Sequence, residues 1–254
     1  MAYTNGPPKI VTDGLVLYTD TMNYKSYSSG SLVILDVASG VSASINRLFR
    51  TTASYANNPL ITTSSVTGQT AVLFENEVSR PEVYFTNRSS RFTFSVWASI
   101  QQINAFLSGN SSQGIFSRGS FQGYVGIHAT RANTGSATSV SVGTRGIGNT
   151  RTVILTGSIG TGSVEDAQIF NAVLVYDSSS IYGYLNGEYK GAVSSSVETT
   201  EFTGSSYAYN TAGGIGGNSG ACTMSIYNSS IYNRALTAQE VEQNFNAMRG
   251  RYGV

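Results

Sequence analysis

Two glutamates close together in the sequence are the first side chains that could do chemistry. Glu75 and Glu77 stand in the segment LFENEV, and side chains two residues apart share one face of a β-strand. Glycoside hydrolysis requires two carboxyl groups flanking the scissile bond. The pair is therefore a candidate for glycan hydrolysis, but we favour the simpler interpretation, in which the two glutamates mark the solvated end of a strand.

The chain has a single histidine, His128, and a single cysteine, Cys222. No serine or cysteine motif accompanies His128, so we interpret it as a structural histidine within a strand and not as a catalytic acid or base. A zinc site requires several histidine or cysteine ligands. One cysteine also excludes an intrachain disulfide, and we interpret Cys222 as a small buried side chain.

Calcium is a metal whose ligands this chain could supply, because calcium takes oxygen ligands from carboxylates and backbone carbonyls. No DxDxDG-type spacing occurs in the sequence. We therefore predict no catalytic residue, no metal site and no cofactor, and calcium stays open as an alternative. The aspartates that could bind it are Asp13, Asp20, Asp36 and Asp177.

Tyrosines form the candidate binding surface. The chain has 16 of them, and a tyrosine ring with its hydroxyl suits both stacking on a sugar ring and packing in a protein interface. The alternative is that these side chains simply cover the outer face of a sheet. The predicted glycan or partner surface consists of Tyr182, Tyr184, Tyr189, Tyr207 and Tyr209.

Three of these tyrosines belong to a predicted three-stranded meander at residues 169–193. Two apolar runs and a closing strand are separated by short turns, and Asn186-Gly187 is the strongest two-residue hairpin signal, because a type I′ turn needs positive φ at both positions. The period of two places Tyr182 and Tyr184 on one face of the middle strand. We expect that face to be half exposed and the opposite face to pack in a core.

Other strands are predicted along most of the chain, and residues 91–100 (RFTFSVWASI) give the clearest alternation of apolar and polar side chains. Glycine-rich turns separate the strands at spacings typical of sandwiches. Residues 38–65 could not be assigned. The further predicted strands are 15–18, 32–37, 72–74, 83–85, 115–117, 123–128, 139–143 and 152–155.

The end of the chain differs, because it predicts a helix at about residues 237–249. Thr237 and Glu240 form a capping box, and Gly250 suits the C-terminal cap. We expect the helix to lie on the edge of the sandwich, with docking on a neighbouring subunit as the alternative. Its apolar stripe consists of Val241, Phe245 and Met248.

Composition limits the classes of partner. The chain has 254 residues, a net charge of +1 and only 11% charged residues, which argues against electrostatic capture of nucleic acid or of an anionic membrane. No apolar run has the length of a signal peptide or a membrane span. We expect a soluble protein made in a cytoplasm without a signal peptide, with no nucleic-acid partner and no membrane insertion.

Several segments together carry a resemblance to a known family. Five segments follow one another in the order of the segments of a concanavalin A-like, laminin-G-like jelly roll, which they resemble. They are FTFSVWASI, GIFSRGSFQGYVGIHA, YGYLNG, GGIGGN and SIYNSSIYNRALTAQEV. The pair VTDGLVLYTDTMNYKSY and NRALTAQEVEQNFNAMRGRY resembles, more narrowly, laminin-G-like virion proteins of tailed bacteriophages. The sequence departs from the phage pattern after Gly30, where LVILDVASGVSASI replaces a tryptophan and an Asn/Gly-rich run.

The resemblance implies an all-β fold, a two-sheet antiparallel β-sandwich with one C-terminal helix. We expect residues 1–14 to form an N-terminal lead and residues 15–254 to form the sandwich domain with its helix. The resemblance also admits a calcium ion at the loop rim, as in other domains of this fold.

The functional expectation from this resemblance is a non-enzymatic virion structural protein, displayed on the particle exterior as a capsid decoration or fibre component. A carbohydrate-binding tail adhesin that recognises a host surface glycan is the alternative, and a glycan hydrolase is a third. The expected partners are other virion proteins and further copies of the chain in a homo-oligomer, with contacts from the N-terminal lead, the C-terminal helix region and the tyrosine-bearing face.

Overall fold

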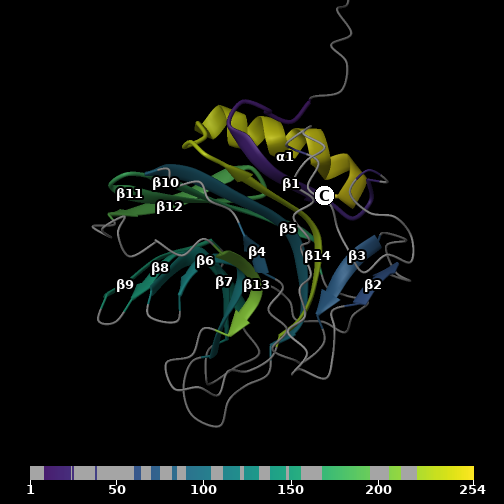
Figure 1. Ribbon diagram of the computed structural model, residues 1–254, viewed down its shortest axis with the longest axis horizontal. Helices are drawn as coiled ribbons and strands as arrows, with labels where there is room; N and C mark the ends of the chain where they lie inside the picture. The colour runs from purple at the N-terminus through teal and green to yellow at the C-terminus, as the bar shows by residue number, and fades with distance from the viewer. Residues whose placement is uncertain are drawn as a thin grey trace, which may run out of the picture.

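The computed structural model describes residues 9–23, 25, 38, 60–63, 70–74, 82–84, 90–103, 111–120, 123–131, 138–146, 149–155, 168–194, 206–212 and 222–254. Within these residues the chain forms two antiparallel sheets and a C-terminal helix (Figure 1). This confirms the predicted two-sheet sandwich.

The larger sheet has eight strands in the order β12-β11-β10-β5-β14-β3-β2, with β1 also pairing with β14. Its strands are β1 (Leu15–Asp20), β2 (Leu60–Thr63), β3 (Thr70–Phe74), β5 (Arg91–Ile103), β10 (Phe170–Asp177), β11 (Ser180–Leu185), β12 (Glu188–Ser194) and β14 (Cys222–Tyr232).

The smaller sheet has six strands in the order β4-β13-β6-β7-β8-β9. Its strands are β4 (Glu82–Tyr84), β6 (Ser111–Ser120), β7 (Gly123–Arg131), β8 (Thr138–Gly146), β9 (Asn149–Ile154) and β13 (Ser206–Ala212). A strand lies at each predicted position that the structure describes. Residues 32–37 lie outside the described residues, and β2 was missed because it lies within the unassigned stretch 38–65.

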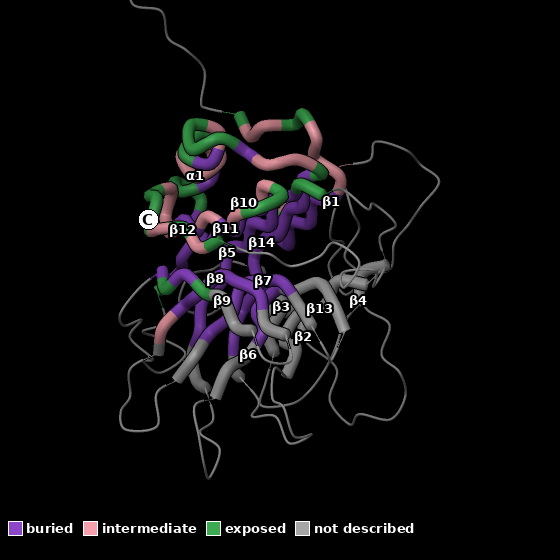
Figure 2. The backbone as a smooth tube through the Cα atoms, turned by 90° about the vertical axis from the view of Figure 1, so that its left-hand side faces the viewer, coloured by how far each residue is buried: buried purple, intermediate pink, exposed green. Residues whose placement is uncertain are grey.

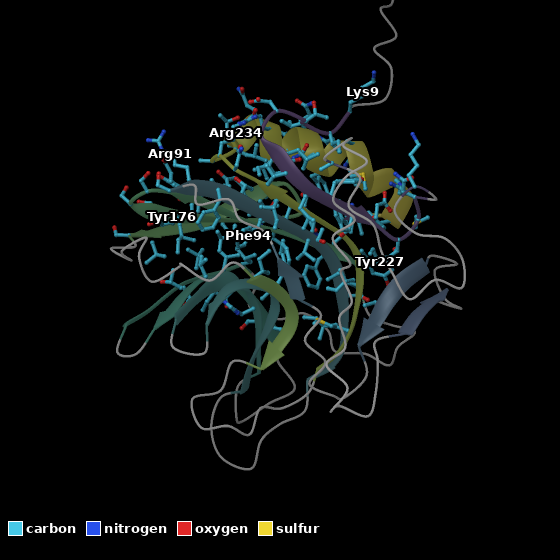
Figure 3. All side chains as sticks on the ribbon, viewed as in Figure 1. Lys9, Arg91, Phe94, Tyr176, Tyr227 and Arg234 are labelled. Atoms are coloured by element: carbon cyan, nitrogen blue, oxygen red, sulfur yellow. The ribbon has the colours of Figure 1, made fainter. Side chains whose placement is uncertain are left out.

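The main core fills the space between the two sheets. Alternate residues of β5 point into it, as the period of two requires, and Figure 3 shows Phe94 and Tyr176 in this layer. Aromatic rings meet there in a chain, with ring centroids 5.0 Å apart for Phe92 and Tyr176 and 5.5 Å apart for Phe94 and Phe116. Purple strands in Figure 2 mark this buried layer. The β5 residues in the core are Phe92, Phe94, Val96, Ala98 and Ile100.

Helix α1 (Ala238–Tyr252) covers the outer face of the eight-stranded sheet (Figure 1). Phe245 stacks on Trp97 of β5 with ring centroids 5.6 Å apart and planes 5° apart. Val241 is buried in one cluster with Val173 of β10 and Tyr232 of β14. These partners come from central strands, so the prediction that the helix lies on the sandwich edge was wrong. The outer face of the strands carries enough apolar side chains to bury the helix stripe there.

Local sequence correctly predicts the start of the helix but not its end. The capping box is confirmed, because the Glu240 amide donates to the Thr237 hydroxyl and the Thr237 amide donates to the Glu240 carboxylate. The helix continues through Gly250 and ends at Gly253, which has φ 72° and ψ 26°. The predicted cap at Gly250 was wrong because Tyr252, which lies beyond Gly250, is buried against the sheet in helical conformation.

The predicted hairpin between β11 and β12 is confirmed. Asn186 has φ 51° and Gly187 has φ 80°, as a type I′ turn requires. The backbone and side chain of Asn186 both bond with the backbone of Asn171, at 2.9 Å each, so the turn is tied to β10. A Cβ atom on Gly187 would lie 2.9 Å from Phe245 of the helix. Glycine is therefore needed there both for its conformation and for the close approach of the helix.

No helix in the described part of the chain is long and apolar enough to cross a membrane.

Candidate binding surface

Three of the five predicted tyrosines come together on the hairpin formed by β11 and β12. Tyr184 pairs with Tyr189 across the two strands, and their rings meet edge to face with centroids 5.6 Å apart. Tyr182 lies two residues before Tyr184 on the same face. We call these three residues the tyrosine hairpin surface. Tyr189 is 55% exposed, whereas Tyr184 is only 6% exposed.

Tyr184 is the anchor of this surface. It belongs to the buried cluster that joins the outer face of the sheet to the helix, together with Val173, Val175 and Val241. Burial raises the pKa of the Tyr184 phenol, and the neighbouring phenols of Tyr189 and Tyr182 raise it further. The hydroxyl of Tyr184 therefore stays protonated at neutral pH.

The expectation of a half-exposed tyrosine face was correct for only part of the hairpin. The helix covers Tyr184, while Tyr182 is half-buried and Tyr189 is exposed. The period of two correctly separates this face from the core-facing one, where a Cβ on Gly183 would lie 2.5 Å from Leu155 and 2.8 Å from Val142. The period does not reveal that a helix distant in sequence would cover part of the tyrosine face.

Two charged residues flank the exposed tyrosine in the sequence of β12 and pair with each other. The Lys190 ammonium donates to the Glu188 carboxylate at 2.7 Å, and these residues lie on either side of Tyr189. The hydrogen bond from Lys190 lowers the pKa of Glu188, so the carboxylate is ionised at neutral pH. Sequence reasoning missed both residues. The signal was available in Asn-Gly-Glu-Tyr-Lys, where two opposite charges flank an aromatic residue directly after a tight turn.

Tyr207 and Tyr209 do not join this surface. Both lie on β13 of the six-stranded sheet, where Tyr207 pairs with Arg118 of β6 and Tyr209 pairs with Phe116. The sequence predicts the meander strands but no strand at residues 206–212, and the sheet to which a strand belongs depends on pairing between distant residues. The five predicted tyrosines therefore lie on two different sheets, and their role in binding stays a prediction.

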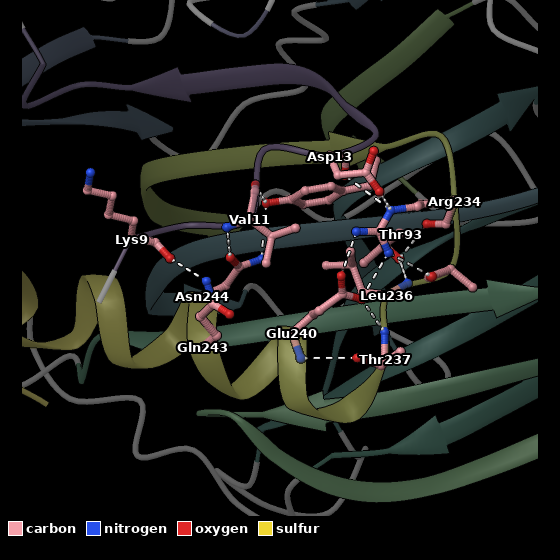
Figure 4. Close-up of polar contacts among 12 residues, drawn as sticks. Lys9, Val11, Asp13, Thr93, Arg234, Leu236, Thr237, Glu240, Gln243 and Asn244 are labelled. Carbon is pink, nitrogen blue, oxygen red and sulfur yellow. Dashed lines mark hydrogen bonds and ion pairs between the residues drawn. The ribbon is translucent and has the colours of Figure 1, made fainter. Parts of the chain in front are cut away.

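The N-terminal lead is held along the helix from Lys9 onward (Figure 4). The Val11 amide donates to the Asn244 side chain at 2.7 Å, and the Gln243 side chain donates to the Lys9 carbonyl at 2.7 Å. The Tyr232 hydroxyl donates to the Val11 carbonyl at 3.0 Å, and burial raises the pKa of Tyr232 to about 12. Residues 1–8 lie outside the described residues. The described part of the lead therefore makes contacts within its own chain.

Arg234 links the lead to the first turn of the helix (Figure 4). Its guanidinium lies 2.8 Å from the Asp13 carboxylate and 2.6 Å from the Glu240 carboxylate. The hydrogen bond from Arg234 is the main cause that lowers the pKa of Glu240 to about 2. The backbone carbonyl of Arg234 also accepts from Thr93 of β5 at 2.9 Å, so this junction fixes the angle at which the helix leaves the sheet.

The candidate calcium ligands lie apart from one another. Asp13 pairs with Arg234, and Asp177 pairs with Arg91 at 2.8 Å. Asp20, only 1% exposed, accepts from Arg251 at 2.7 Å. Asp36 lies outside the described residues. Within the described ranges no group of three or more His, Cys, Asp or Glu side chains is arranged to hold a metal ion.

Among the residues that the structure describes, the remaining candidates form no catalytic arrangement. Glu75 and Glu77 lie outside the described residues. His128 is buried within β7 opposite Gly114 and Ser141, which confirms its predicted place in a strand. Cys222 begins β14 and pairs with Ile103 of β5.

Comparisons with known proteins give one family. The Laminin_G_3 model, described as the concanavalin A-like lectin/glucanases superfamily, matches residues 61–242. A search of curated proteins finds no match.

Solved structures share the fold at low sequence identity. Botulinum neurotoxin type C, which depends on interaction with two ganglioside molecules to enter cells, has a TM-score of 0.59 at 12% identity, covering 94% of this chain and 52% of that one. The binding domain of botulinum neurotoxin DC, in complex with rat synaptotagmin II, has a TM-score of 0.57 at 13% identity, covering 94% and 52%. A Trypanosoma rangeli sialidase has a TM-score of 0.59 at 14% identity, covering 98% and 36%. The chain thus spans about half the length of these neurotoxin structures.

Proposed function

Because the chain belongs to the concanavalin A-like lectin/glucanases superfamily, we propose that it acts as a non-enzymatic binding module displayed on the exterior of a bacteriophage particle. The fold is lectin/glucanase-like, and it is shared by binding domains and by a sialidase. The phage setting rests on the resemblance of its first strand and its C-terminal helix segment to laminin-G-like virion proteins.

The proposal that the module is not an enzyme rests on the ion pairs and the pKa values of the carboxylates that the structure describes. Five of them pair with arginine or lysine, and cationic partners lower the pKa of Glu188 and Glu240. A glycosidase acid needs the opposite, a carboxyl group whose pKa is raised so that it holds a proton. The described carboxylates therefore support a structural role. The five are Asp13, Asp20, Asp177, Glu188 and Glu240.

The ligand of the module is either another virion protein or a host surface glycan. The exposed tyrosine of the hairpin suits both, because its ring stacks on sugars and packs in protein interfaces. The described part of the lead and the helix are occupied by contacts within the chain. We therefore place partner contacts on the surfaces that remain open, and we place other virion proteins and further copies of the chain among the partners.

The second candidate function is that of a tail adhesin whose ligand is a glycan. The ganglioside dependence of botulinum neurotoxin type C belongs to that toxin, yet it makes a glycan a ligand class worth testing on this fold. The observation in favour is the exposure of Tyr189, whose aromatic ring can stack on a sugar.

Immunogold electron microscopy of intact particles, with antibody raised against the chain, tests the proposal. Label over the head supports a capsid decoration protein, and label confined to the tail end supports the adhesin. Particles without label would overturn the virion role. A reducing-sugar assay tests the other half, because sugar release by the wild type that Glu75→Gln abolishes would overturn the non-enzymatic assignment.

A further inference from the structure

We propose that a β-bulge at Lys190 keeps strand β12 from pairing with the same strand of a second copy, so that copies of the chain do not associate by extending the eight-stranded sheet. The inference goes beyond the proposed function, because it concerns the edge of the sheet and not the ligand. Three features of β12 carry it: its place at the edge, an inserted residue, and the side on which its charges lie.

Strand β12 ends the eight-stranded sheet, and β11 is its only hydrogen-bonded neighbour among the described strands. Residue pairs in an antiparallel ladder alternate between bonded and non-bonded, and the pair that closes a two-residue turn is bonded. Leu185 and Glu188 form that closing pair. The next pair, Tyr184 and Tyr189, is therefore non-bonded, and the N–H and C=O of Tyr189 point away from β11. Such groups at a sheet edge are a template for another strand.

The strand carries one inserted residue. Tyr184 pairs with Tyr189, whereas the preceding residue of β11, Gly183, pairs with Gly191. Lys190 is therefore the extra residue of a β-bulge. Gly191 has φ 148°, a value that residues with a side chain rarely adopt, so glycine at this position permits the bulge.

The bulge changes the spacing of the groups at the free edge. A regular strand presents outward N–H and C=O groups at every second residue. Here Lys190 and Gly191 together face Gly183 at one bonded position, so Ala192, which pairs with Tyr182, is the next residue after Tyr189 whose groups point outward. The interval is three residues instead of two. A regular partner strand therefore cannot bond with both Tyr189 and Ala192.

The charges of β12 lie on the side that faces the other sheet. Directly paired residues share one face of a sheet, and Glu188 is opposite Leu185, which packs against the main core. The Lys190 ammonium lies 2.7 Å from the Glu188 carboxylate. A strand added beyond β12 would place its own side chains against this ion pair and remove it from water, which is costly. Charged side chains that point inward are one way in which proteins protect a sheet edge.

A second copy of the chain is the partner that this arrangement excludes most strongly. Two identical edge strands meet antiparallel about a two-fold axis, so the same surface contributes from both molecules. Each strand would then bring its own bulge and its own ion pair. The mismatch in spacing and the loss of solvent around the charges would both occur twice.

Deletion of Lys190 tests the proposal in the full chain. It removes the bulge and one charge, and the pairs on either side of the bulge can then follow one another without a shift. We expect sedimentation velocity to show self-association of the deletion variant at a concentration on the order of tenfold below that of the wild type. Hydrogen exchange should then be slowed at the Tyr189 amide in the associated form.

Lys190→Val separates the charge from the bulge, because it keeps the chain length. We expect it to increase self-association less than the deletion does. Lys9→Val is the matched control, since Lys9 is an exposed lysine on the lead and its replacement makes the same change of charge away from β12. Thermal unfolding of each variant shows whether the fold is intact. If the deletion variant does not fold, Lys190→Val that associates no more than Lys9→Val overturns the proposal.

Two further results would overturn the proposal. One is a folded deletion variant that associates no more than the wild type. The other is a wild-type dimer in which the Tyr189 amide is protected from exchange, because the edge would then pair despite the bulge. Neither result bears on the particle labelling, which tests the virion role separately.

Discussion

The two faces of the eight-stranded sheet are built differently. The face toward the six-stranded sheet is apolar from Phe92 to Ile100 on β5, the part of this strand whose side chains the structure describes. The outer face of the same strand carries Thr93, Ser95 and Trp97, and it is covered by the helix and the lead. Apolar burial, which has no preferred direction, stabilises the first face. The second face adds to its own apolar burial individual hydrogen bonds and ion pairs that position the helix and the lead.

This difference explains why recognition is placed at the hairpin. Specific bonds of Asn244, Arg234 and Arg251 fasten the helix and the lead over the central strands, so that part of the outer face belongs to the fold. The helix leaves Tyr189 exposed on the edge strand β12. A surface that the fold supports but does not cover is the one suited to a ligand.

The largest expected effect comes from the inner face. Phe94 is fully buried among aromatic rings, so Phe94→Ala leaves a cavity and should lower the free energy of unfolding by about 3–5 kcal/mol. Chemical denaturation followed by fluorescence measures it. Ile154→Val on the exposed side of β9 should change stability by under about 0.5 kcal/mol. A similar, small loss from both variants would contradict the account of the core.

The next effect comes from the ion pair that holds the end of the helix on the outer face. Arg251→Met leaves the buried Asp20 charge without its arginine, and we expect a loss of about 1–3 kcal/mol, since the partly exposed arginine is screened by solvent. Denaturation midpoints measure the loss. We expect the double variant, Arg251→Met with Asp20→Asn, to recover part of the stability that Arg251→Met loses. The absence of any loss in the single variant would mean that the pair does not fasten the helix.

The helix cap gives a smaller effect. Thr237→Ala removes the hydroxyl that accepts from the Glu240 amide and should cost about 1 kcal/mol. Thr12→Ala is the control, because Thr12 is an exposed threonine that contributes its backbone carbonyl to the turn before β1. Urea denaturation of both variants distinguishes the cap from a general effect of threonine replacement, and equal losses would argue against a capping role.

The last expected effect is a dependence on pH. The pKa of Glu240 is lowered from 4.5 to about 2, so the unfolded chain takes up this proton more readily than the folded one. The stabilisation is complete above about pH 4.5 and is lost as the pH falls toward about 2. Unfolding free energies across this range should fall less steeply in Glu240→Gln. Identical slopes for the two proteins would contradict the lowered pKa.

Local chemistry in the sequence predicted local structure well. Asn186-Gly187 and the Thr237–Glu240 box each act within four residues, and the structure has both. The helix termination at Gly253 and the burial of Tyr184 depend on contacts between the helix and strands far away in sequence. Periodicity cannot reveal such contacts, because it reports which face of an element is apolar and not what covers it.

The predicted tyrosines show the same distinction between local and distant contacts. Tyr182, Tyr184 and Tyr189 come together because a tight turn joins their strands, whereas Tyr207 and Tyr209 belong to a strand whose pairing with β6 and β4 is not encoded locally. The charged pair around Tyr189 was visible in the sequence, but its meaning depends on the exposure of that tyrosine. Glu75 and Glu77 stay a prediction that the described residues do not test.

The most direct test of the division between a fastened outer face and an open hairpin is an NMR titration of the ¹⁵N-labelled chain with a glycan that the chain binds. We expect the amide signals of Asn186, Glu188, Tyr189 and Ala192 to shift with increasing ligand, while those of β5 and β14 beneath the helix stay in place. Shifts confined to the six-stranded sheet, with the hairpin unchanged, would contradict it.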